Sequence, residues 1–323
     1  MPLIANANAE DVVAAPAISR FVTAQDGVRL HVRDYGAPLA RALPVVCLPG
    51  LARTAADFES LAPALSSAGQ RRVLALDYRG RGKSDFDPHP ANYNLHVELA
   101  DVLAVLTALG IGRAAFIGTS RGGILTMLLA VARPTAIAGC VLNDIGPVIE
   151  LEGLMRIKGY VGKLAQPASF GEAAGALRQR FGSHFPKWDD ADWRAFAHRT
   201  FKEEGGRIVP DYDPALATVL AAVSPERPLP PLWREFDALA HIPATLTKRM
   251  LGRQRKTPGG CPPGVAIQAV MRASGNDVAM DADTDRVVVL ILDRVHGSRL
   301  SRAGQIGPQH LRPVGCRINP LIF

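Results

Sequence analysis

The sequence of 323 residues lacks the features of secreted proteins, of membrane-spanning proteins and of proteins stabilised by a structural metal site. Its four cysteines lie far apart and form no Cys-x-x-Cys pair, which argues against a disulfide framework and a structural zinc site. No uninterrupted apolar run approaches the roughly 20 residues that a membrane-spanning helix needs. Residues 1–15 contain no lysine or arginine, although a secretory signal begins with basic residues. We therefore expect a cytoplasmic protein with no membrane partner and no metal site.

Acidic residues become scarce after residue 244, and glutamate disappears. Residues 1–244 contain 25 basic and 25 acidic residues, whereas residues 245–323 contain 12 basic residues and 5 aspartates and so carry the whole net charge of +7. The basic charges of this tail are sparse and no aromatic residues lie between them, so we expect no nucleic-acid partner. The abrupt change in composition suggests the hypothesis that residues from about 245 onward arose through an altered reading frame. Translating the coding DNA in its other two frames tests this hypothesis.

The first 145 residues alternate short apolar runs with helical periods, the pattern of a mostly parallel sheet with crossover helices. The helical periods span Ala55–Ala68, Leu95–Leu109 and Arg121–Ala132. The dipeptide Asp26-Gly27 favours a hairpin, so the sheet is expected to open with an antiparallel pair. The sequence therefore predicts an α/β fold. The expected strands are Ile18–Thr23, Val28–Tyr35, Pro44–Leu48, Arg72–Asp77, Ala114–Gly118 and Ala138–Asn143.

Residues 147–232 are expected to form a helical cap over the sheet. They show amphipathic helical patterns without a convincing buried strand, and they end in a proline-rich stretch at 224–231. Trp188 and Trp193 would line an apolar pocket, although aromatic residues in helices more often belong to the core. The expected organisation is a first part of the core at 18–146, the cap at 147–232, the rest of the core at 233–300 and a disordered tail at 301–323.

The strongest local signal is a G-x-S-x-G pattern at residues 118–122, with Ser120 at its centre. An apolar run precedes the pattern and a helical period follows it. The serine is therefore expected on a sharp strand-to-helix turn that projects its hydroxyl from the backbone. Side chains at Gly118 and Gly122 would collide in so tight a turn. Ser120 is a candidate nucleophile for acyl transfer, and the alternative is that it only caps the helix.

Two further loops follow predicted strands. The Pro-Gly turn at 49–50 leads to Leu51, which is positioned to donate one of the two backbone N–H groups that an oxyanion hole needs. Arg121, after the serine, would donate the other. The alternative for the first loop is an ordinary strand-ending turn. The glycines of residues 77–84 fail the spacing of a phosphate-binding Walker loop, so we expect a tight loop held by arginine and aspartate side chains.

Together these motifs resemble the α/β-hydrolase fold family over residues from about 18 to 242. The resemblance implies a Ser–His–Asp hydrolase with a helical lid and no cofactor. It maps the family's nucleophile onto Ser120 and the family's oxyanion donors onto the N–H groups of Leu51 and Arg121. Asn143-Asp144-Ile145-Gly146-Pro147 and its flanking residues are similar to the ester- and enol-lactone-hydrolase branch. The three matched signatures are L-P-G-L at 48–51, D-Y-R-G-R-G-K-S at 77–84 and G-T-S-R-G-G at 118–123.

The sequence departs from the family pattern where the acid and the base belong. In this family the order along the chain is serine, acid, histidine, and the acid follows the next-to-last strand. Here the strand expected near His241–Ala244 leads into a basic stretch without a carboxylate. Asp144, at the end of the sixth strand, is an alternative acid because that strand lies beside the nucleophile strand, or else it only caps a loop.

Two later apolar runs offer another acid and a base. Val265–Met271 would form a strand that leads to Asp277, the candidate acid. Arg286–Leu292 would form a buried strand that leads to His296, the candidate base, in a loop similar to the one that carries the family's histidine. After His296 the family pattern would close with a helix, but the remaining residues show no helical period of useful length.

Two functions are therefore weighed. The first is a serine hydrolase that cleaves a small-molecule carboxylic ester or lactone through an acyl-enzyme, with Ser120 as nucleophile and His296 as base. The second is a catalytically impaired protein of the same fold, a pseudoenzyme with an altered C-terminus, which would bind carbonyl ligands without turnover. The two differ in whether His296 comes within hydrogen-bond reach of Ser120. The residues leave the substrate's identity and the oligomeric state open.

Overall fold

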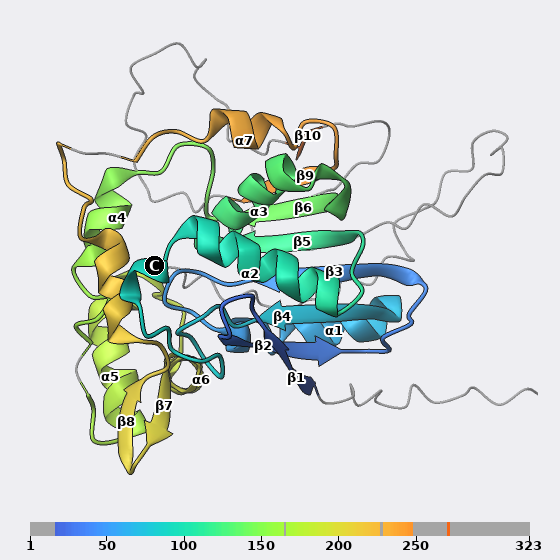
Figure 1. The fold of residues 1–323 in the computed structure, drawn as a ribbon. Helices are drawn as coiled ribbons and strands as arrows, with labels where there is room; N and C mark the ends of the chain where they lie inside the picture. The colour runs from blue at the N-terminus through green and yellow to red at the C-terminus, as the bar shows by residue number, and fades with distance from the viewer. Residues whose placement is uncertain (1–16, 165, 227–228, 248–269, 272–323) are drawn as a thin grey trace, which may run out of the picture.

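The computed structural model describes residues 17–164, 166–226, 229–247 and 270–271. In these residues one sheet runs through the middle of the molecule, with helices on both faces and a cap at one end (Figure 1). The strands follow the spatial order β1-β2-β4-β3-β5-β6-β9-β10. This is the expected α/β fold. The strands are β1 (Ile18–Thr23), β2 (Arg29–Tyr35), β3 (Ala42–Leu48), β4 (Arg71–Leu76), β5 (Ala114–Thr119), β6 (Ile137–Asn143), β9 (Ala244–Thr247) and β10 (Val270–Met271).

The centre of the sheet is parallel and its margins are antiparallel. Strands β4, β3, β5, β6 and β9 pair in parallel, whereas β1 pairs with β2 and β2 pairs with β4 in the antiparallel sense. Gly27, with φ of +91°, lies in the predicted hairpin between β1 and β2. Of the strand predicted at 265–271, the structure describes only Val270–Met271, which pairs antiparallel with β9. The carboxyl ends of β3 and β5 therefore lie side by side, and the functional loops follow from them.

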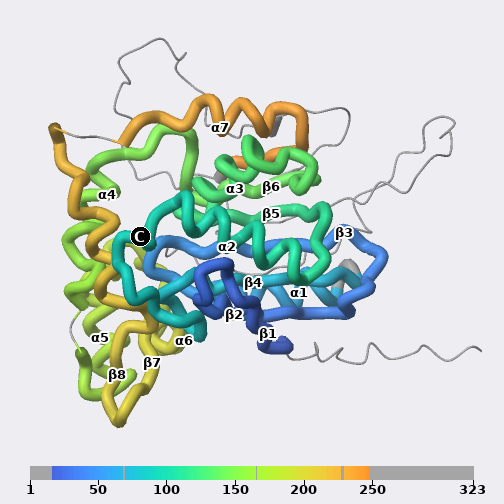
Figure 2. The backbone as a smooth tube through the Cα atoms, viewed as in Figure 1, coloured from blue at the N-terminus to red at the C-terminus, as the bar shows by residue number. Residues whose placement is uncertain are grey.

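Alternating apolar residues let each central strand contribute to two cores. In β3, Val45 and Cys47 face one side, and Val46 and Leu48 face the other. The first side packs on α1 (Leu61–Gly69). The second side packs on three helices that Figure 2 shows on one face of the sheet, namely α2 (Leu95–Ala108), α3 (Arg121–Ala132) and α7 (Trp233–Asp237).

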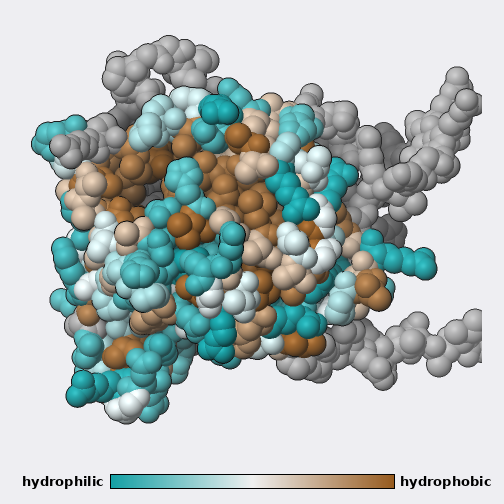
Figure 3. Space-filling view, in the orientation of Figure 1, coloured by the Kyte–Doolittle hydropathy of each residue, from teal (hydrophilic) through white to brown (hydrophobic). Residues whose placement is uncertain are grey.

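The helix-covered face in view is apolar at its surface as well as beneath it. Figure 3 shows hydrophobic residues gathered over α2 and α3. Leu99, Leu103 and Leu128 are half-buried there and pack against the core below. No helix in the described ranges is both long enough and apolar enough to cross a membrane.

The cap has its own apolar core, formed by residues of α4 (Leu151–Lys158), α5 (Phe170–Phe181), α6 (Asp190–Thr200) and the segment after it. The sequence led us to expect a cap made of helices alone, but the cap also contains two strands. Strands β7 (Phe201–Glu204) and β8 (Arg207–Pro210) form an antiparallel hairpin. The turn between them is Gly205-Gly206, with φ of 56° and 75°, a backbone conformation that glycine adopts without strain.

Candidate active site

Ser120 occupies the sharp turn that the motif predicts between β5 and α3. Its φ is 47° and its ψ is −109°, a conformation that costs free energy for any residue with a side chain. The backbone N–H of Ser120 donates to the carbonyl oxygen of Asn143 at 2.9 Å, so the end of β6 holds the turn in place. Strain of this kind is maintained by its surroundings, and it commonly marks a functional residue.

Close backbone approaches make the two predicted glycines of the turn necessary. A Cβ at Gly118 would lie 2.5 Å from the carbonyl oxygen of Gly122. A Cβ at Gly122 would lie 2.1 Å from the carbonyl oxygen of Leu48, which is the last residue of β3. Glycine at 122 therefore brings the loop after β3 next to Ser120, as an oxyanion hole built from both loops requires.

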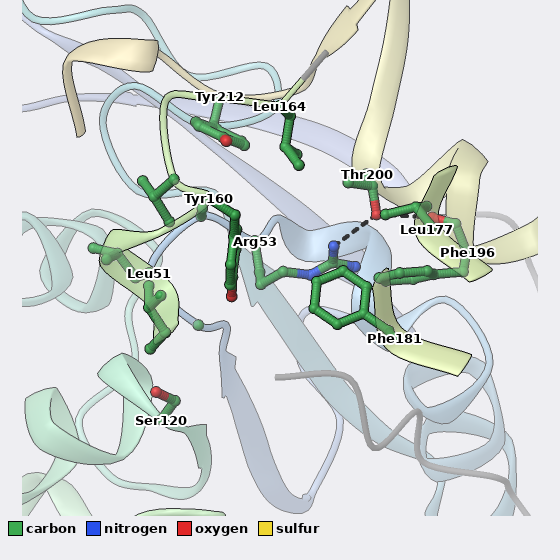
Figure 4. A pocket seen from close by; sticks show the side chains of 14 residues that line it. Leu51, Arg53, Ser120, Tyr160, Leu164, Leu177, Phe181, Phe196, Thr200 and Tyr212 are labelled. Atoms are coloured by element: carbon green, nitrogen blue, oxygen red, sulfur yellow. Dashed lines mark hydrogen bonds between the residues drawn. The ribbon is translucent and has the colours of Figure 1, made fainter. Parts of the chain in front are cut away.

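A cavity between the sheet and the cap contains Ser120 on its wall (Figure 4). It comprises about 540 Å³ of space unoccupied by atoms, part of it open to solvent. Most of its lining is apolar. The residues that line it are Gly50, Leu51, Ala52, Arg53, Ser120, Ile157, Tyr160, Val161, Leu164, Leu177, Phe181, Phe196, Thr200 and Tyr212.

The two predicted oxyanion donors come from the loop after β3 and from the first residue of α3. Leu51 lines the same cavity, and its backbone N–H donates to no acceptor within the part of the chain that the structure describes. Arg121 is the first residue of α3, where a backbone N–H has no partner inside the helix. Both N–H groups are therefore available to an oxyanion, and their catalytic role stays a prediction.

A buried charge cluster of Arg81, Glu98 and Arg121 connects these two donors. Glu98 of α2 pairs with Arg81 at 2.8 Å and with Arg121 at 2.5 Å, and Glu98 and Arg81 are completely buried. Arg81 also donates through Nε to the carbonyl oxygen of Leu51 at 2.8 Å. Burial raises the pKa of Glu98, but Arg121 and Arg81 more than offset this and hold its pKa below the usual value. Glu98 is therefore ionised, and the cluster carries one surplus positive charge beneath the oxyanion site.

A second, largely buried cluster is centred on Arg79 of the loop at residues 77–84. Arg79 pairs with Asp101 of α2 at 2.6 Å, with Asp87 at 2.5 Å and with Asp26 at 2.7 Å. Asp77 accepts hydrogen bonds from the backbone N–H groups of Ala55 and Lys83. The prediction of a tight loop held by arginine and aspartate side chains is therefore confirmed.

Of the two candidate acids and the candidate base, the structure describes only Asp144. Asp144 directly follows Asn143, whose carbonyl accepts from Ser120, and its φ of 54° bends the chain at the end of β6. Its role as the acid stays a prediction. Asp277 and His296 lie outside the described residues, and their assignment also stays a prediction.

A Ser–His–Asp chain does occur elsewhere in the structure. His31 lies 2.7 Å from Asp77 through Nδ1 and 3.0 Å from the hydroxyl of Ser19 through Nε2. None of these three residues lines the cavity that contains Ser120. Because Asp77 also organises its own loop, we interpret this chain as a structural element that joins β1, β2 and the end of β4.

The cavity contains polar residues from the loop after β3 and from the cap that the sequence did not indicate. Arg53 of the loop after β3 donates to Asp57 and, at 2.8 Å, to the hydroxyl of Thr200 at the end of α6. Tyr160 and Tyr212 also line the cavity. The expectation that the cap tryptophans line it is wrong, because Trp193 is buried in the cap core and Trp188 packs against it. The sequence around Arg53 gave no strong signal for this role, because its partner Thr200 lies 147 residues further along the chain.

Comparison with known proteins places this arrangement among hydrolases. A family model described as the alpha/beta hydrolase fold matches residues 44–203. A 3-hydroxybutyrate-oligomer hydrolase from Cupriavidus necator is 30% identical over 221 residues, which cover 65% of this chain and 73% of that protein. Epoxide hydrolase A from Mycobacterium tuberculosis is 28% identical over 243 residues, or 69% of this chain and 68% of that protein.

A solved structure gives the same result. The crystal structure of an alpha/beta hydrolase from Novosphingobium aromaticivorans is 45% identical, with a TM-score of 0.67. The match covers 72% of this chain and 81% of that one. The relatives named here are all hydrolases, which supports hydrolytic activity for this chain.

Proposed function

Because the chain belongs to the α/β-hydrolase fold family, we propose that it is a serine hydrolase that cleaves carboxylic esters or lactones through an acyl-enzyme. The observation that carries this proposal is the position of Ser120. It lies in a strained turn at the end of β5, on the wall of a largely apolar cavity that Leu51 also lines, and the N–H of Leu51 has no acceptor among the described residues.

In the proposed reaction the hydroxyl oxygen of Ser120 attacks the substrate carbonyl, and His296 accepts the hydroxyl proton. The N–H groups of Leu51 and Arg121 bind the oxyanion that forms, and Asp277 or Asp144 orients the histidine. Collapse of this intermediate breaks the bond to the alcohol oxygen, which takes the proton from the histidine. Water then attacks the acyl-serine by the same route, releases the carboxylic acid and restores Ser120.

The nucleophile's chemistry favours acyl substrates over epoxides, although one relative is an epoxide hydrolase. A serine that opened an epoxide would form an ether, which water does not cleave, so the enzyme would be trapped after one turnover. A serine that attacks an ester or lactone forms an ester, which water can cleave. The relative from Cupriavidus necator is a 3-hydroxybutyrate-oligomer hydrolase, and a hydroxy acid linked head to tail is joined by ester bonds.

The second candidate remains the pseudoenzyme, since it requires only that the acid or the base be missing. The basic composition of residues 245–323 favours it, because that segment contains both His296 and Asp277. Such a protein would bind carbonyl compounds at Ser120 without hydrolysing them.

Labelling with a fluorophosphonate probe tests the two candidates. We expect rapid labelling of a single peptide that contains Ser120, no labelling of Ser120→Ala, and at least a 100-fold slower reaction of His296→Ala, in line with the about 10²–10⁴-fold contribution of a general base. Ser19→Ala is the matched control, because Ser19 belongs to the other Ser–His–Asp chain, and we expect it to label normally. A folded protein that does not react at Ser120 would favour the pseudoenzyme.

A further inference from the structure

The polar groups of the cavity include a hydroxyl that no residue of the described ranges satisfies. Tyr160 is only 9% exposed, and its hydroxyl has no hydrogen-bond partner within the described part of the chain. In Figure 4 Tyr160 lies between Leu51 and Arg53, with its hydroxyl directed into the cavity. Burial raises its pKa, so the phenol stays protonated and can donate a hydrogen bond at every physiological pH. The hydroxyl oxygen is not one of the buried polar atoms without a partner in the described residues, so it reaches the open space of the cavity, where a ligand can supply the acceptor.

Further from Ser120, the Arg53 guanidinium is fixed and partly unsatisfied. Asp57 accepts from its Nε and Nη2, Thr200 accepts from its Nη1 at 2.8 Å, and its carbon lies 4.9 Å from the centre of the Phe196 ring. These contacts use three of the five N–H groups of an arginine. The other two have no acceptor among the described residues. The guanidinium is therefore held ready for an acceptor oxygen.

The other two hydroxyls that line the cavity beyond Ser120 each have a hydrogen-bond partner in the cavity wall. The hydroxyl of Thr200 donates to the carbonyl oxygen of Phe196, and the hydroxyl of Tyr212 accepts from the N–H of Gly162. Beyond Ser120, an apolar cavity thus offers a nearer donor at Tyr160 and a further donor at Arg53. A plain alkyl chain would leave both without partners, at a cost for each buried donor.

We propose that the acyl part of the substrate is a hydroxyacyl chain, whose hydroxyl or ester oxygen accepts a hydrogen bond from Tyr160. The next carbonyl or carboxylate along the same chain accepts from Arg53. An oligomer of a short hydroxy acid has this composition, because its oxygens recur at intervals along an aliphatic chain. This inference rests on the proposed function, and it makes Tyr160 and Arg53 determinants of substrate specificity.

Two p-nitrophenyl esters that differ by one hydroxyl test the role of Tyr160. We compare kcat/KM for p-nitrophenyl 3-hydroxybutyrate with that for p-nitrophenyl butyrate, using the full-length protein. We expect the wild type to prefer the hydroxylated ester about 10-fold, the effect of one well-formed hydrogen bond. Tyr160→Phe should bring this ratio close to one. Tyr212→Phe removes the same atom from a tyrosine on the same cavity, and it should preserve the ratio.

The p-nitrophenyl ester of the 3-hydroxybutyrate dimer tests the role of Arg53, since its acyl part carries a second carbonyl. The double variant Arg53→Gln with Asp57→Asn removes both charges of this ion pair, so neither member is left without the other. It should lower kcat/KM for the dimer ester at least 5-fold more than for the monomer ester, when p-nitrophenolate release is followed in both cases.

The outcomes separate this inference from the function on which it rests. Turnover that requires Ser120, with substrate ratios unchanged in Tyr160→Phe and in the double variant, would overturn the hydroxyacyl assignment and leave the serine hydrolase intact. A folded wild type that hydrolyses none of these esters would overturn both. Loss of the ratio in Tyr212→Phe as well as in Tyr160→Phe would also overturn the assignment, because the effect would then belong to the cavity wall in general.

Discussion

Replacing Glu98 by glutamine tests whether the buried charge cluster positions both oxyanion donors. Glu98 is completely buried, and it is the carboxylate that both Arg81 and Arg121 contact. Glutamine keeps the shape but removes the charge, so two buried guanidinium groups would be left uncompensated. Breaking a buried pair in this way costs about 3–5 kcal/mol, a large part of a typical domain's free energy of unfolding.

The effect on catalysis follows from the second contact of Arg81. Its Nε holds the carbonyl oxygen of Leu51 at 2.8 Å, while the other arginine of the cluster begins the helix at the nucleophile. If glutamine lets Arg81 shift, Leu51 loses its fixed position relative to Ser120. A displacement of about 1 Å in a catalytic group can cost about 100-fold in rate, so we expect kcat to fall by up to about 100-fold with a smaller change in KM.

Asp101→Asn is the matched control, because the two carboxylates lie three residues apart on α2 and both contact an arginine of the same loop. Arg79 keeps Asp26 and Asp87 when Asp101 loses its charge, so the stability loss should be smaller. The side-chain hydrogen bonds of Arg79 within the described residues all go to aspartates and not to Leu51, so kcat of this variant should stay near that of the wild type.

The assay combines urea unfolding with kcat measured well below the unfolding transition, where both variants are folded. A boronic acid that mimics the tetrahedral intermediate adds a direct readout, because its affinity reports on the oxyanion donors. Glu98→Gln should weaken boronic-acid binding by about the same factor as kcat. A folded Glu98→Gln protein with wild-type kcat and boronic-acid affinity would refute the reasoning, and so would an equal loss in Asp101→Asn.

Two further predictions concern stability. Gly122→Ala should lower the midpoint of thermal unfolding sharply, because its Cβ would lie 2.1 Å from a backbone oxygen, whereas Gly175→Ala, in a helix with open space around it, should raise the midpoint slightly. Burial is the main cause that raises the pKa of Asp211, and the nearby Asp77 is the second. The folded state therefore favours the protonated carboxyl, and it loses stability as the pH rises from the unfolded-state pKa of Asp211 through its raised folded-state pKa. Asp211→Asn should therefore stabilise the protein more at pH 7 than at pH 4 in urea unfolding, and an equal effect at both pH values would contradict the assigned cause.

The order of elements up to residue 145 could be predicted because local patterns determine it. Strand β1 has the same bounds in the prediction and in the structure, and α3 does too. Apolar runs of six or seven residues between glycine-rich loops leave few alternatives for a sheet covered on both faces. The cap hairpin was missed because each of its strands has four residues, one of them buried, so no buried apolar run marks them, and the Gly205-Gly206 turn was its one clear signal.

The candidate site also contains some residues that could be predicted from the sequence and others that could not. Ser120 and Leu51 lie in short motifs whose geometry depends on neighbours in the sequence, so both could be named in advance. Arg53 and Tyr160 line the cavity only because the cap folds over the sheet, and no spacing of residues in the sequence predicts the contact between cap and sheet. Glu98 did leave a signal, because it lies on the same buried stripe of α2 as Val102 and Val105, where a charged residue needs a buried partner.

The loop that holds the oxyanion donors also anchors the cap. Gly82 donates to the carbonyl of Asp211 at 3.0 Å, and the N–H of Asp213 donates to the carbonyl of Gly80 at 2.7 Å, so the cap's later segment is joined to this loop by backbone hydrogen bonds. Tyr93 adds a 2.5 Å hydrogen bond to the Asp213 carboxylate. The side chain of Arg81, between the two glycines, reaches Leu51. A cap movement that broke these bonds would therefore also disturb the oxyanion site, so the position of the later cap segment is coupled to the geometry at Ser120.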